Sequence, residues 1–449
     1  MIALRLSEIA AALGLPGPAQ DPVIESIVSD SRKVDYGSLF AALPGTHIDG
    51  HEFAGTAVEL GAVALLVSQP QELPVPQLLV ADVLVALGRI AKMVRTRVDP
   101  AVVGITGSNG KTTVKEMLAS ILRQQGEVLA TQGNFNNELG LPLTLFRLSP
   151  QHRFAVMEMG ASKAGDIAYL CGIALPDVGV ITNVGPAHLE GFGSEAGVAA
   201  AKGEIYAALP ATGCAILNGD QSWCPMWRQM NTADRVVVFG TGPAHDVRFE
   251  QLEAGARMFT PAGGFDVRLT LPGAHNLMNA AAATAAAFAL DVPLEKIRLG
   301  LEAVEPVPGR LNLIRTDAGW TVIDDTYNAN PASLYSALQV LAGMQGTPWL
   351  VLGDMKELGG DSRKLHAEVG DAAKALGVKR IFATGEMAAS TVDAFGQGAR
   401  HYVAQAELID ALQAELRPGI NCLVKGSRSM GMERVVQAIR VQRVLQEAC

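Results

Sequence analysis

The stretch Val102–Val114, VVGITGSNGKTTV, constrains the fold of this chain more than any other. It begins with an apolar run that predicts a buried parallel strand. The glycine-rich segment 106–113 predicts a tight turn, and 114–122 has the apolar spacing of a helix. Glycines let backbone N–H groups turn toward an anion, and the N-terminus of a helix adds partial positive charge. A strand, a turn and a helix in this order therefore predict a phosphate cradle.

The side chains of this turn also fit a nucleotide. Lys111 can reach the outer phosphates, and the hydroxyl of Thr112 can bind Mg²⁺. The motif is a shortened GxxGKT, because Ile105 stands where a glycine or another small residue is expected. Gly-Lys-Thr also occurs in ordinary turns, but the strand before it and the helix after it favour a nucleotide site. The residues expected to hold the phosphates are Gly107, Ser108, Asn109, Gly110, Lys111, Thr112 and Thr113.

Length and composition limit the architecture and the class of partner. A chain of 449 residues is too long for one hydrophobic core, which predicts two to four domains. Hydrophobic residues make up 49% of the chain and charged residues 18%, which is typical of a folded chain and not of a disordered one. The net charge of −9 argues against a nucleic-acid partner, because phosphate backbones attract basic surfaces.

The cysteines and the apolar stretches predict a cytoplasmic protein without a membrane span. The five cysteines are scattered and contain no CxxC pair, which favours a reducing compartment over a disulfide framework or a thiolate metal site. The first residues predict a short strand and a helix, with Ser7 as N-cap and Gly14 as stop signal, and not a signal peptide. The apolar stretch Ala280–Leu290 is far shorter than a bilayer span.

Changes in the sequence pattern predict three domains, at 1–97, 98–310 and 311–449. The first alternates short helices and strands. The second repeats strand–helix units, which predicts a mostly parallel sheet with helices on both faces. Pro306–Arg310 is typical of a hinge, and a new α/β unit follows it. The predicted fold class is α/β, with a small N-terminal α/β domain, a central phosphate-loop domain and a C-terminal Rossmann-like domain.

Polar side chains follow the strands of the predicted central sheet, where parallel strands present their ligand-binding edge. Glu158 ends one strand and His188 follows another, so the two could complete a Mg²⁺ site that begins at Thr112. A histidine is an unusual Mg²⁺ ligand, and a lone histidine after a strand is more often an ordinary loop residue. Lys202 lies on the next predicted helix, and its ordinary interpretation is a surface lysine.

Three other polar clusters are weaker indications of a site. Asn276 and Asn279 share one face of a helix and could read an adenine edge, although an N-cap explains Asn276 equally well. Polar turns after the C-terminal strands, from Asp324 and Lys425 onward, predict a second binding edge. A cluster of hydroxyl and basic residues near the N-terminus could hold a phosphorylated ligand, but such clusters are more often solvated turns. Its members are Ser29, Ser31, Arg32, Thr46 and His47.

Taken together, these motifs resemble those of the Mur ligase family of ATP-dependent amide-bond-forming enzymes. The resemblance covers essentially the whole chain in collinear order. Within the family, GNFNNELGLPLTL, GDMKELG and KGSRSMGMERVV favour the step that adds D-alanyl-D-alanine to UDP-N-acetylmuramoyl-tripeptide. The motifs that carry the family resemblance are TGSNGKTT at 106–113, Glu158, HLEGFGS at 188–194, Lys202, HNLMN at 275–279, Pro308–Arg310 and DDTYNANP at 324–331.

The resemblance implies the cofactors ATP and Mg²⁺, an acyl-phosphate intermediate, and the substrates UDP-N-acetylmuramoyl-tripeptide and D-alanyl-D-alanine. The chain is expected to be a monomer. In the family the lysine that matches Lys202 is often carbamylated, which would turn a cation into a carboxylate-like metal ligand. The implied catalytic residues are Lys111, Glu158, His188 and Lys202, and the implied Mg²⁺ ligands are Thr112, Glu158, His188 and Lys202. The implied nucleotide contacts beyond the phosphate loop are Asn276, Asn279, Arg310, Asp325 and Asn328.

By the same resemblance, the N-terminal domain holds the UDP end of the substrate. The implied substrate contacts are Ser29, Ser31, Arg32, Thr46, His47, Asn134, Asn136, Asn137, Lys425, Ser427 and Arg428.

Several alternatives stay open on the sequence. Another Mur step or folylpolyglutamate synthase would share the ATP residues, but Asn328, where other members commonly have histidine, and the lack of an Asp-Asn-Pro-Arg stretch favour the D-alanyl-D-alanine step. A phosphate-loop regulatory protein would be expected to carry Asn-Lys-x-Asp, which does not occur. A small-molecule kinase would transfer phosphate to a stable product. The sequence leaves open whether the tripeptide ends in diaminopimelate or in lysine.

Overall fold

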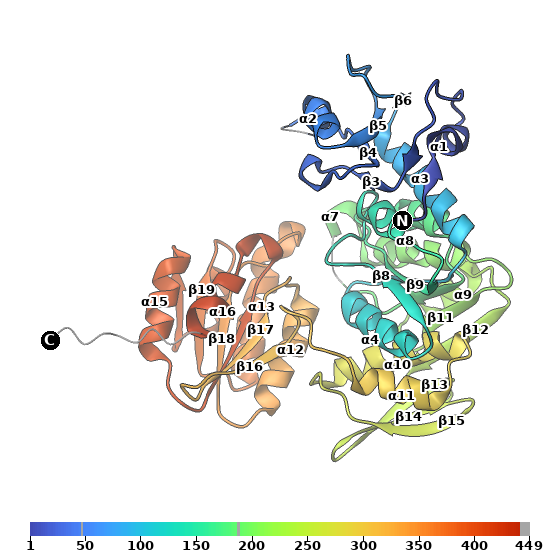
Figure 1. The fold of residues 1–449 in the computed structure, drawn as a ribbon. Coiled ribbons are helices and arrows are strands. Elements are labelled where there is room, and N and C mark those ends of the chain that lie inside the picture. The colour runs from blue at the N-terminus through green and yellow to red at the C-terminus, as the bar shows by residue number, and fades with distance from the viewer. Residues whose placement is uncertain (46–47, 186–188, 441–449) are drawn as a thin grey trace.

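The computed structural model describes residues 1–45, 48–185 and 189–440. Three residues that the sequence singled out, Thr46, His47 and His188, lie outside the described residues. The described chain forms three α/β domains, with the N-terminal domain at one end of the central domain and the C-terminal domain beside it (Figure 1). No helix in this described part is long and apolar enough to cross a bilayer.

The N-terminal domain is built on a parallel sheet of four strands in the order β3-β4-β5-β6, next to a small antiparallel pair of β1 and β2. Its elements are β1 (Leu4–Arg5), α1 (Leu6–Leu13), β2 (Val23–Ile24), β3 (Ser26–Val28), η1 (Ser31–Lys33), β4 (Ser38–Ala41), η2 (Gly50–Phe53), α2 (Ala54–Glu59), β5 (Ala62–Val67), β6 (Gln77–Leu79) and α3 (Val83–Val98).

The start of α1 differs from the expectation. Gly14 ends the helix in a left-handed conformation with φ +74°, as predicted, but Ser7 is not the N-cap. Arg5 takes that position, and its backbone N–H donates to the Glu8 carboxylate at 2.7 Å. Ser7 lies inside the helix and donates from its hydroxyl to Asp21 Oδ2 at 3.0 Å. The reason is that burial of Leu6 draws the first helical turn onto the core.

Helix α3 fastens the N-terminal domain to the central domain. The guanidinium of Arg95, only 4% exposed, donates to the carbonyl oxygens of Ala174 and Leu175, each at 3.0 Å. A Cβ atom at Gly88 would lie 2.9 Å from Ile173 Cδ1, so glycine permits the close approach of α3 to α6 (Asp166–Ala174). Helix α3 ends at Val98, next to the first predicted boundary. Its buried residues belong to one hydrophobic core that includes residues of both domains.

The central domain contains a sheet of nine strands in the order β15-β14-β13-β12-β11-β10-β7-β9-β8. The strands from β13 to β8 are parallel, as expected, whereas β14 and β15 form an antiparallel edge that the sequence analysis did not foresee. Neighbouring residues of β7 face opposite cores: Val102 packs against one, and Val103 and Ile105 pack against the other. This alternation places helices on both faces of the sheet.

The first of these cores lies against α3, α5, α6, α8 and α9, and the second against α4, α10 and α11. The elements are β7 (Ala101–Thr106), α4 (Lys111–Arg123), β8 (Glu127–Ala130), α5 (Gly140–Leu145), β9 (His152–Glu158), α6 (Asp166–Ala174), β10 (Val178–Ile181), α7 (Leu189–Phe192), α8 (Glu195–Ala207), β11 (Cys214–Asn218), α9 (Cys224–Met230), β12 (Arg235–Gly240), β13 (Val247–Leu252), β14 (Gly255–Thr260), β15 (Gly263–Val267), α10 (Ala274–Ala289) and α11 (Leu294–Glu302).

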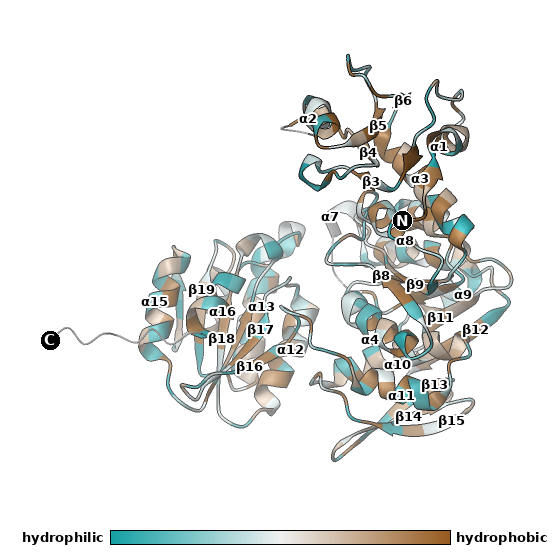
Figure 2. Cartoon of the chain, viewed as in Figure 1, coloured by the Kyte–Doolittle hydropathy of each residue, from teal (hydrophilic) through white to brown (hydrophobic). Residues whose placement is uncertain are grey.

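The C-terminal domain is a six-stranded sheet in the order β16-β17-β21-β18-β19-β20, parallel except for β16. Hydrophobic cores lie on both of its faces, and Figure 2 shows hydrophobic strands within the large sheets. The elements are β16 (Asn312–Arg315), β17 (Thr321–Asp325), α12 (Pro331–Gly343), β18 (Thr347–Leu352), η3 (Gly359–Asp361), α13 (Ser362–Ala375), β19 (Arg380–Thr384), α14 (Ala389–Phe395), β20 (Ala399–Tyr402), α15 (Gln405–Glu415), β21 (Ile420–Lys425), η4 (Arg428–Met430) and α16 (Glu433–Arg440).

We propose that the boundaries at 97/98 and 310/311 separate the domains of this chain. The proposal is supported by the sheets, because the four-stranded, nine-stranded and six-stranded sheets each fall within one of the three ranges. The segment at the second boundary is bonded to the end of β17. Gly309 N–H donates to Asp324 Oδ2 at 3.1 Å, and Leu311 N–H donates to Asp325 Oδ1 at 3.2 Å.

Candidate active site

A cavity of about 1360 Å³ is lined by residues from all three domains. Its walls are the phosphate loop and the loops after β8 and β9, the start of α10, the hinge, and the loops after β17, β18 and β21. Helix α3 contributes Leu84. Pockets for one small molecule commonly measure about 300–1,000 Å³, so this cavity has room for more than one ligand.

The phosphate loop joins β7 to α4 as the sequence predicted. The loop is held against the residues that follow β10: Asn109 N–H donates to Asn183 Oδ1 at 3.0 Å, and Ser108 N–H donates to the Asn183 carbonyl at 2.9 Å. A Cβ atom on Gly107 would lie 1.9 Å from Thr182 Oγ1, and one on Gly110 would lie 2.4 Å from Asn279 Oδ1. Both positions therefore require glycine, and α4 begins directly afterwards at Lys111.

Lys111 points back over its own loop. Its Nζ donates to the Gly107 carbonyl at 2.7 Å. Desolvation lowers the pKa of Lys111, against the opposing effect of the nearby Glu158 carboxylate. A cation that bonds a neutral carbonyl in a desolvated cavity is placed to receive an anionic ligand.

Thr112 and Glu158 meet at the end of β9. Thr112 Oγ1 donates to Glu158 Oε2 at 2.9 Å, and Asn136 Nδ2 donates to Glu158 Oε1 at 2.9 Å. Glu158 is 3% exposed, and its backbone N–H donates to Thr131 Oγ1 at 3.0 Å. A hydroxyl and an oriented carboxylate are the oxygen donors that Mg²⁺ prefers. Asn136, which is also expected to contact the substrate, orients this carboxylate.

The rest of the predicted metal set is only partly described. Among the residues that the structure describes, no three His, Cys, Asp or Glu side chains gather at a point that could hold a metal ion, and His188 lies outside them. Lys202 lines the cavity from α8 and is 2% exposed, so its ordinary interpretation as a surface lysine is wrong. Desolvation, helped by the charge of Lys111, lowers the pKa of Lys202 to about 7.

Asn276 and Asn279 both line the cavity from the first turns of α10. Asn276 Nδ2 donates to the Pro272 carbonyl at 2.7 Å, and Asn279 Nδ2 donates to Asn276 Oδ1 at 3.1 Å. The alternative that Asn276 is an N-cap is wrong, because Gly273 occupies that position and Asn276 lies inside the helix.

Asp325 and Lys425 meet at the carboxyl ends of β17 and β21, where they stand opposite each other in register. Lys425 Nζ donates to Asp325 Oδ2 and, at 3.0 Å, to the Asn328 carbonyl. Both side chains are buried, and desolvation lowers the pKa of Lys425. Asp325 is predicted to contact the nucleotide and Lys425 the substrate, and the structure also joins the two side chains as an ion pair.

The loops after β18 and β21 form one wall of the cavity. Lys356 N–H donates to Ser427 Oγ at 2.8 Å, and Ser427 N–H donates to the Asp354 carbonyl at 3.0 Å. The buried Asp354 carboxylate also pairs with Lys356 Nζ at 2.8 Å. Glu357 lines the same wall with φ +63°, a left-handed conformation that is strained for a residue with a side chain. The motif GDMKELG contains both Asp354 and Glu357, but the sequence alone gave neither residue a role.

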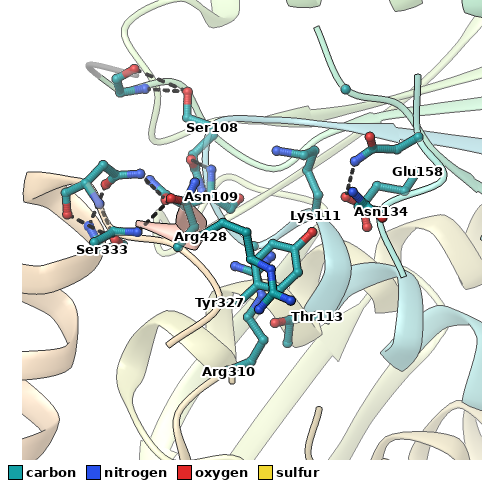
Figure 3. Close-up of a pocket in the computed structure, with 18 of the residues that line it drawn as sticks. Ser108, Asn109, Lys111, Thr113, Asn134, Glu158, Arg310, Tyr327, Ser333 and Arg428 are labelled. Atoms are coloured by element: carbon teal, nitrogen blue, oxygen red, sulfur yellow. Dashed lines mark hydrogen bonds between the residues drawn. The ribbon is translucent and has the colours of Figure 1, made fainter. Parts of the chain in front are cut away.

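Three residues of the C-terminal half touch the phosphate loop or lie over it (Figure 3). Arg310 Nη2 donates to Thr112 Oγ1 at 3.3 Å, and Asn330 Nδ2 donates to Asn109 Oδ1 at 2.8 Å. The Arg310 guanidinium carbon lies 3.9 Å from the centre of the Tyr327 ring. Neither Tyr327 nor Asn330 was predicted as a site residue, although the motif DDTYNANP contains both. A sequence motif does not show which of its side chains contacts another domain.

The predicted substrate residues are divided between two places. Asn134, Asn136, Asn137, Lys425, Ser427 and Arg428 line the cavity. Ser29, Ser31 and Arg32 lie in the N-terminal domain and do not line it. Arg32 pairs with Asp30 through Nε at 2.9 Å and Nη2 at 2.8 Å, and its side chain is 86% exposed. This hydrogen-bonded pairing lowers the pKa of Asp30 to about 2.

Three family models match this chain: the catalytic domain of the Mur ligase family over 23–125, the Mur ligase middle domain over the overlapping range 105–287, and the Mur ligase, glutamate ligase domain over 309–428. A relative from Escherichia coli (strain K12), UDP-N-acetylmuramoyl-tripeptide–D-alanyl-D-alanine ligase, is 42% identical over 98% of this chain and 99% of its own length. The chain belongs to the Mur ligase family.

Solved Mur ligase structures have the same fold. A crystal structure of MurF from Acinetobacter baumannii superposes with a TM-score of 0.91 at 36% identity, covering 98% of this chain and 99% of that one. MurF ligase from Thermotoga maritima, in complex with ADP, superposes with a TM-score of 0.83 at 30% identity, covering 92% and 97%. The Mur ligase resemblance and the three-domain α/β fold expected from the sequence are confirmed.

Proposed function

We propose that this Mur ligase joins D-alanyl-D-alanine to UDP-N-acetylmuramoyl-tripeptide at the expense of ATP. The products are ADP, phosphate and UDP-N-acetylmuramoyl-pentapeptide, a peptidoglycan precursor. The observation that carries this function is one cavity in which the phosphate loop of the central domain faces the polar loops of the C-terminal domain. Relatives of that name match essentially the whole chain.

In this proposal ATP lies along the central side of the cavity. Its phosphates rest on Gly107–Thr113, where the N-terminus of α4 and the Lys111 ammonium offset their charge. Asn276 and Asn279 contact the adenine edge from the start of α10. Arg310, Asp325 and Asn328 contact the nucleotide from across the hinge. A contact of Arg310 with the phosphates is supported by its Nη2, which donates to Thr112 Oγ1 in the phosphate loop.

The residues at the end of β9 fit Mg²⁺. Glu158 is buried, both of its oxygens accept hydrogen bonds, and one of them faces the Thr112 hydroxyl. Thr112 and Glu158 would hold the ion together with His188 and a carbamate on Lys202. A carbamate suits this position because a bare ammonium would repel a cation, whereas a desolvated lysine with a lowered pKa supplies the neutral amine that carbamylation needs. Bound Mg²⁺ would neutralise charge on the transferred phosphoryl group.

The reaction has two steps. The terminal carboxylate of the tripeptide attacks the γ-phosphorus of ATP, which forms a C–O–P bond and releases ADP. The amine of D-alanyl-D-alanine, having lost one proton, attacks the acyl carbon, and the tetrahedral adduct expels phosphate, which carries away a second proton. The protein provides position and electrostatic stabilisation in both steps, as is general for phosphoryl transfer.

The two substrates enter from opposite sides. We place the tripeptide along the loop that holds Asn134 and Asn137, and the dipeptide against Lys425, Ser427 and Arg428. The UDP end would extend to Ser29, Ser31 and Arg32 in the N-terminal domain, with Thr46 and His47. A long nucleotide-linked peptide fits this arrangement, because the N-terminal cluster does not line the cavity itself.

The experiment that tests this function is phosphate release from ATP and Mg²⁺ with UDP-N-acetylmuramoyl-tripeptide, with and without D-alanyl-D-alanine. We expect release that depends on both substrates and a product heavier by the dipeptide. Tripeptides that end in diaminopimelate and in lysine are compared in parallel. Release only with a folate or with a single amino acid would contradict the substrate assignment. It would not affect the assignment of the ligase fold.

We also propose that the protein acts as a monomer in the cytoplasm, where ATP is available. The four cysteines that the structure describes are free and buried, which supports a reducing compartment. Light scattering on the purified chain at micromolar concentration should give the mass of one chain, 47.1 kDa. A mass of twice that value would contradict the proposal.

A further inference from the structure

Two guanidinium groups approach the ring of Tyr327 in the cavity. The guanidinium carbon of Arg310 lies 3.9 Å from the ring centre, and that of Arg428 lies 6.0 Å from it. The three residues come from different segments: Arg310 from the hinge, Tyr327 from the loop after β17, and Arg428 from the start of η4. Figure 3 shows the two arginines gathered at this ring.

The position of Tyr327 is set by its own backbone. Tyr327 N–H donates to the Gly309 carbonyl at 3.1 Å, which ties the loop to the hinge. On one side of the tyrosine, the Thr326 hydroxyl donates to Asp324 Oδ1 at 2.6 Å, and on the other the Asn328 carbonyl accepts from Lys425 Nζ. The backbone that carries the ring is therefore held in place by the protein itself.

The two arginines face different parts of the proposed reaction. Arg310 Nη2 reaches the Thr112 hydroxyl at 3.3 Å, on the phosphate side. Its Nε is buried without a hydrogen-bond partner among the described residues, so the ring face is a main attraction for this side chain. Arg428 lies on the wall formed by the loops after β18 and β21, pairs with Glu433 at 3.3 Å, and is 66% exposed.

An aromatic face attracts guanidinium groups, whereas two guanidinium groups repel each other. Lys111 in the same cavity adds a third positive charge. A ring that attracts both arginines can hold them near each other while the cavity is without its anionic ligands. A leucine would fill part of the same space without this attraction.

We propose that Tyr327 is a positioning residue that couples the two sides of the cavity. Through Arg310 it fixes a cation at the transferred phosphoryl group, and through Arg428 it fixes a cation for the carboxylate of the incoming dipeptide. The inference rests on the proposed function for the identity of the dipeptide. The tyrosine of the DDTYNANP motif would then hold Arg310 and Arg428 together, which neither arginine can do alone.

The test compares Tyr327→Phe and Tyr327→Leu with Tyr335→Leu as the matched control. Tyr335 lies on α12 in the same domain, is 48% exposed, and does not line the cavity. We expect the phenylalanine variant, which keeps the ring face, to stay within about threefold of the parent in kcat and in both KM values. The leucine variant should lose at least about tenfold in kcat and gain at least about fivefold in KM for D-alanyl-D-alanine. Tyr335→Leu should change neither.

A second measurement tests the coupling itself. If Tyr327 acts through Arg428, then Arg428→Ala should raise the KM for the dipeptide much less in the Tyr327→Leu background than in the parent. Fully additive losses would overturn the proposal. A leucine variant whose only change is a higher KM for ATP would also overturn it, because the ring would then serve the nucleotide alone.

Two controls separate this inference from its assumptions. Calorimetry with a non-hydrolysable ATP analogue, which keeps the γ-phosphoryl group, needs no acceptor, so a weaker affinity in Tyr327→Leu than in the parent, with ADP affinity unchanged, supports the Arg310 half even if the dipeptide is misassigned. If the leucine variant does not fold, Tyr327→Met replaces it, because methionine also lacks an aromatic face and should show the same losses. A tenfold loss in Tyr327→Phe would overturn the proposal by showing that the hydroxyl, and not the ring, is required.

Discussion

The central and C-terminal sheets direct the carboxyl ends of their strands into the same cavity, but they treat charge in opposite ways. At the central edge, Lys111 bonds a backbone carbonyl and Lys202 is desolvated, and within the described residues neither ammonium lies at ion-pair distance from a carboxylate. At the C-terminal edge, Lys425 pairs with Asp325, and Lys356 pairs with Asp354.

The difference separates an edge whose lysines have no carboxylate partner among the described residues from an edge whose lysines also hold the fold together. A buried charge without a partner destabilises a fold unless a ligand supplies the opposite charge, so the central edge is built for an anion or for a covalent change at lysine. Internal pairs at the C-terminal edge hold adjoining strands and loops in place. Substitutions at the central edge should therefore remove activity and spare the fold, whereas those at the C-terminal edge should weaken the fold.

The largest expected effect is at Lys202. Lys202→Ala should abolish measurable turnover, because the proposed carbamate ligand is lost, and it should leave the midpoint of thermal unfolding unchanged, because a desolvated amine is removed. Added formate or acetate should partly restore phosphate release. A Lys202→Ala enzyme with full activity would show that no carbamate is needed, and a large drop in thermal stability would break the contrast between the two edges.

The second effect concerns stability at the opposite edge. Asp325→Asn leaves the Lys425 ammonium buried without its carboxylate, which should lower the free energy of unfolding by about 3–5 kcal/mol. Urea denaturation followed by tryptophan fluorescence measures the loss. The matched control is Asp325→Asn combined with Lys425→Met, which removes both charges and should lose markedly less. An equal loss in the two proteins would show that the pair itself is not what the fold depends on.

Lys111→Ala comes third. It should reduce kcat a hundredfold or more, about 3 kcal/mol of transition-state stabilisation, with little change in thermal stability. Steady-state phosphate release at saturating ATP gives the rate, and Lys111→Arg keeps the charge as a comparison. A near-normal kcat in the alanine variant would contradict the assignment of Lys111 to the phosphates.

The smallest effect is expected at the contact between the two edges. Asn330→Asp keeps the side-chain oxygen that caps α12 through Ser333 N–H at 2.9 Å, but it loses the Nδ2 donor to Asn109 Oδ1. We expect a rise of about twofold to fivefold in KM for ATP, on the scale of one hydrogen bond, with stability nearly unchanged. Asn330→Ala should give the same KM and also lose about 1 kcal/mol of stability with the cap. An unchanged KM in both variants would remove this contact from the site.

Local structure near the phosphate loop was predictable because its signals are local. The apolar residues of β7, the glycines of the turn and the helical spacing of α4 lie within about twenty residues, and each requires its own backbone conformation. The prediction of Ser7 as the N-cap of α1 was wrong, because burial of Leu6, a tertiary effect, prevailed over the capping preference of Ser7. The antiparallel strands β14 and β15 were not predicted. They extend the central sheet beyond β13, and the repeating strand–helix pattern does not indicate such an extension.

The sequence by itself determined the three α/β domains, the phosphate loop, the family and many of the polar residues that line the cavity. Only the tertiary structure decided how those residues are partnered. Strand register pairs Asp325 with Lys425, the orientation of α8 buries Lys202, and the hinge brings Arg310 to Thr112 and Tyr327. Such contacts join side chains that are far apart in the chain. A local sequence pattern indicates the backbone preference of a short segment, and it does not show which distant segments meet when long loops close.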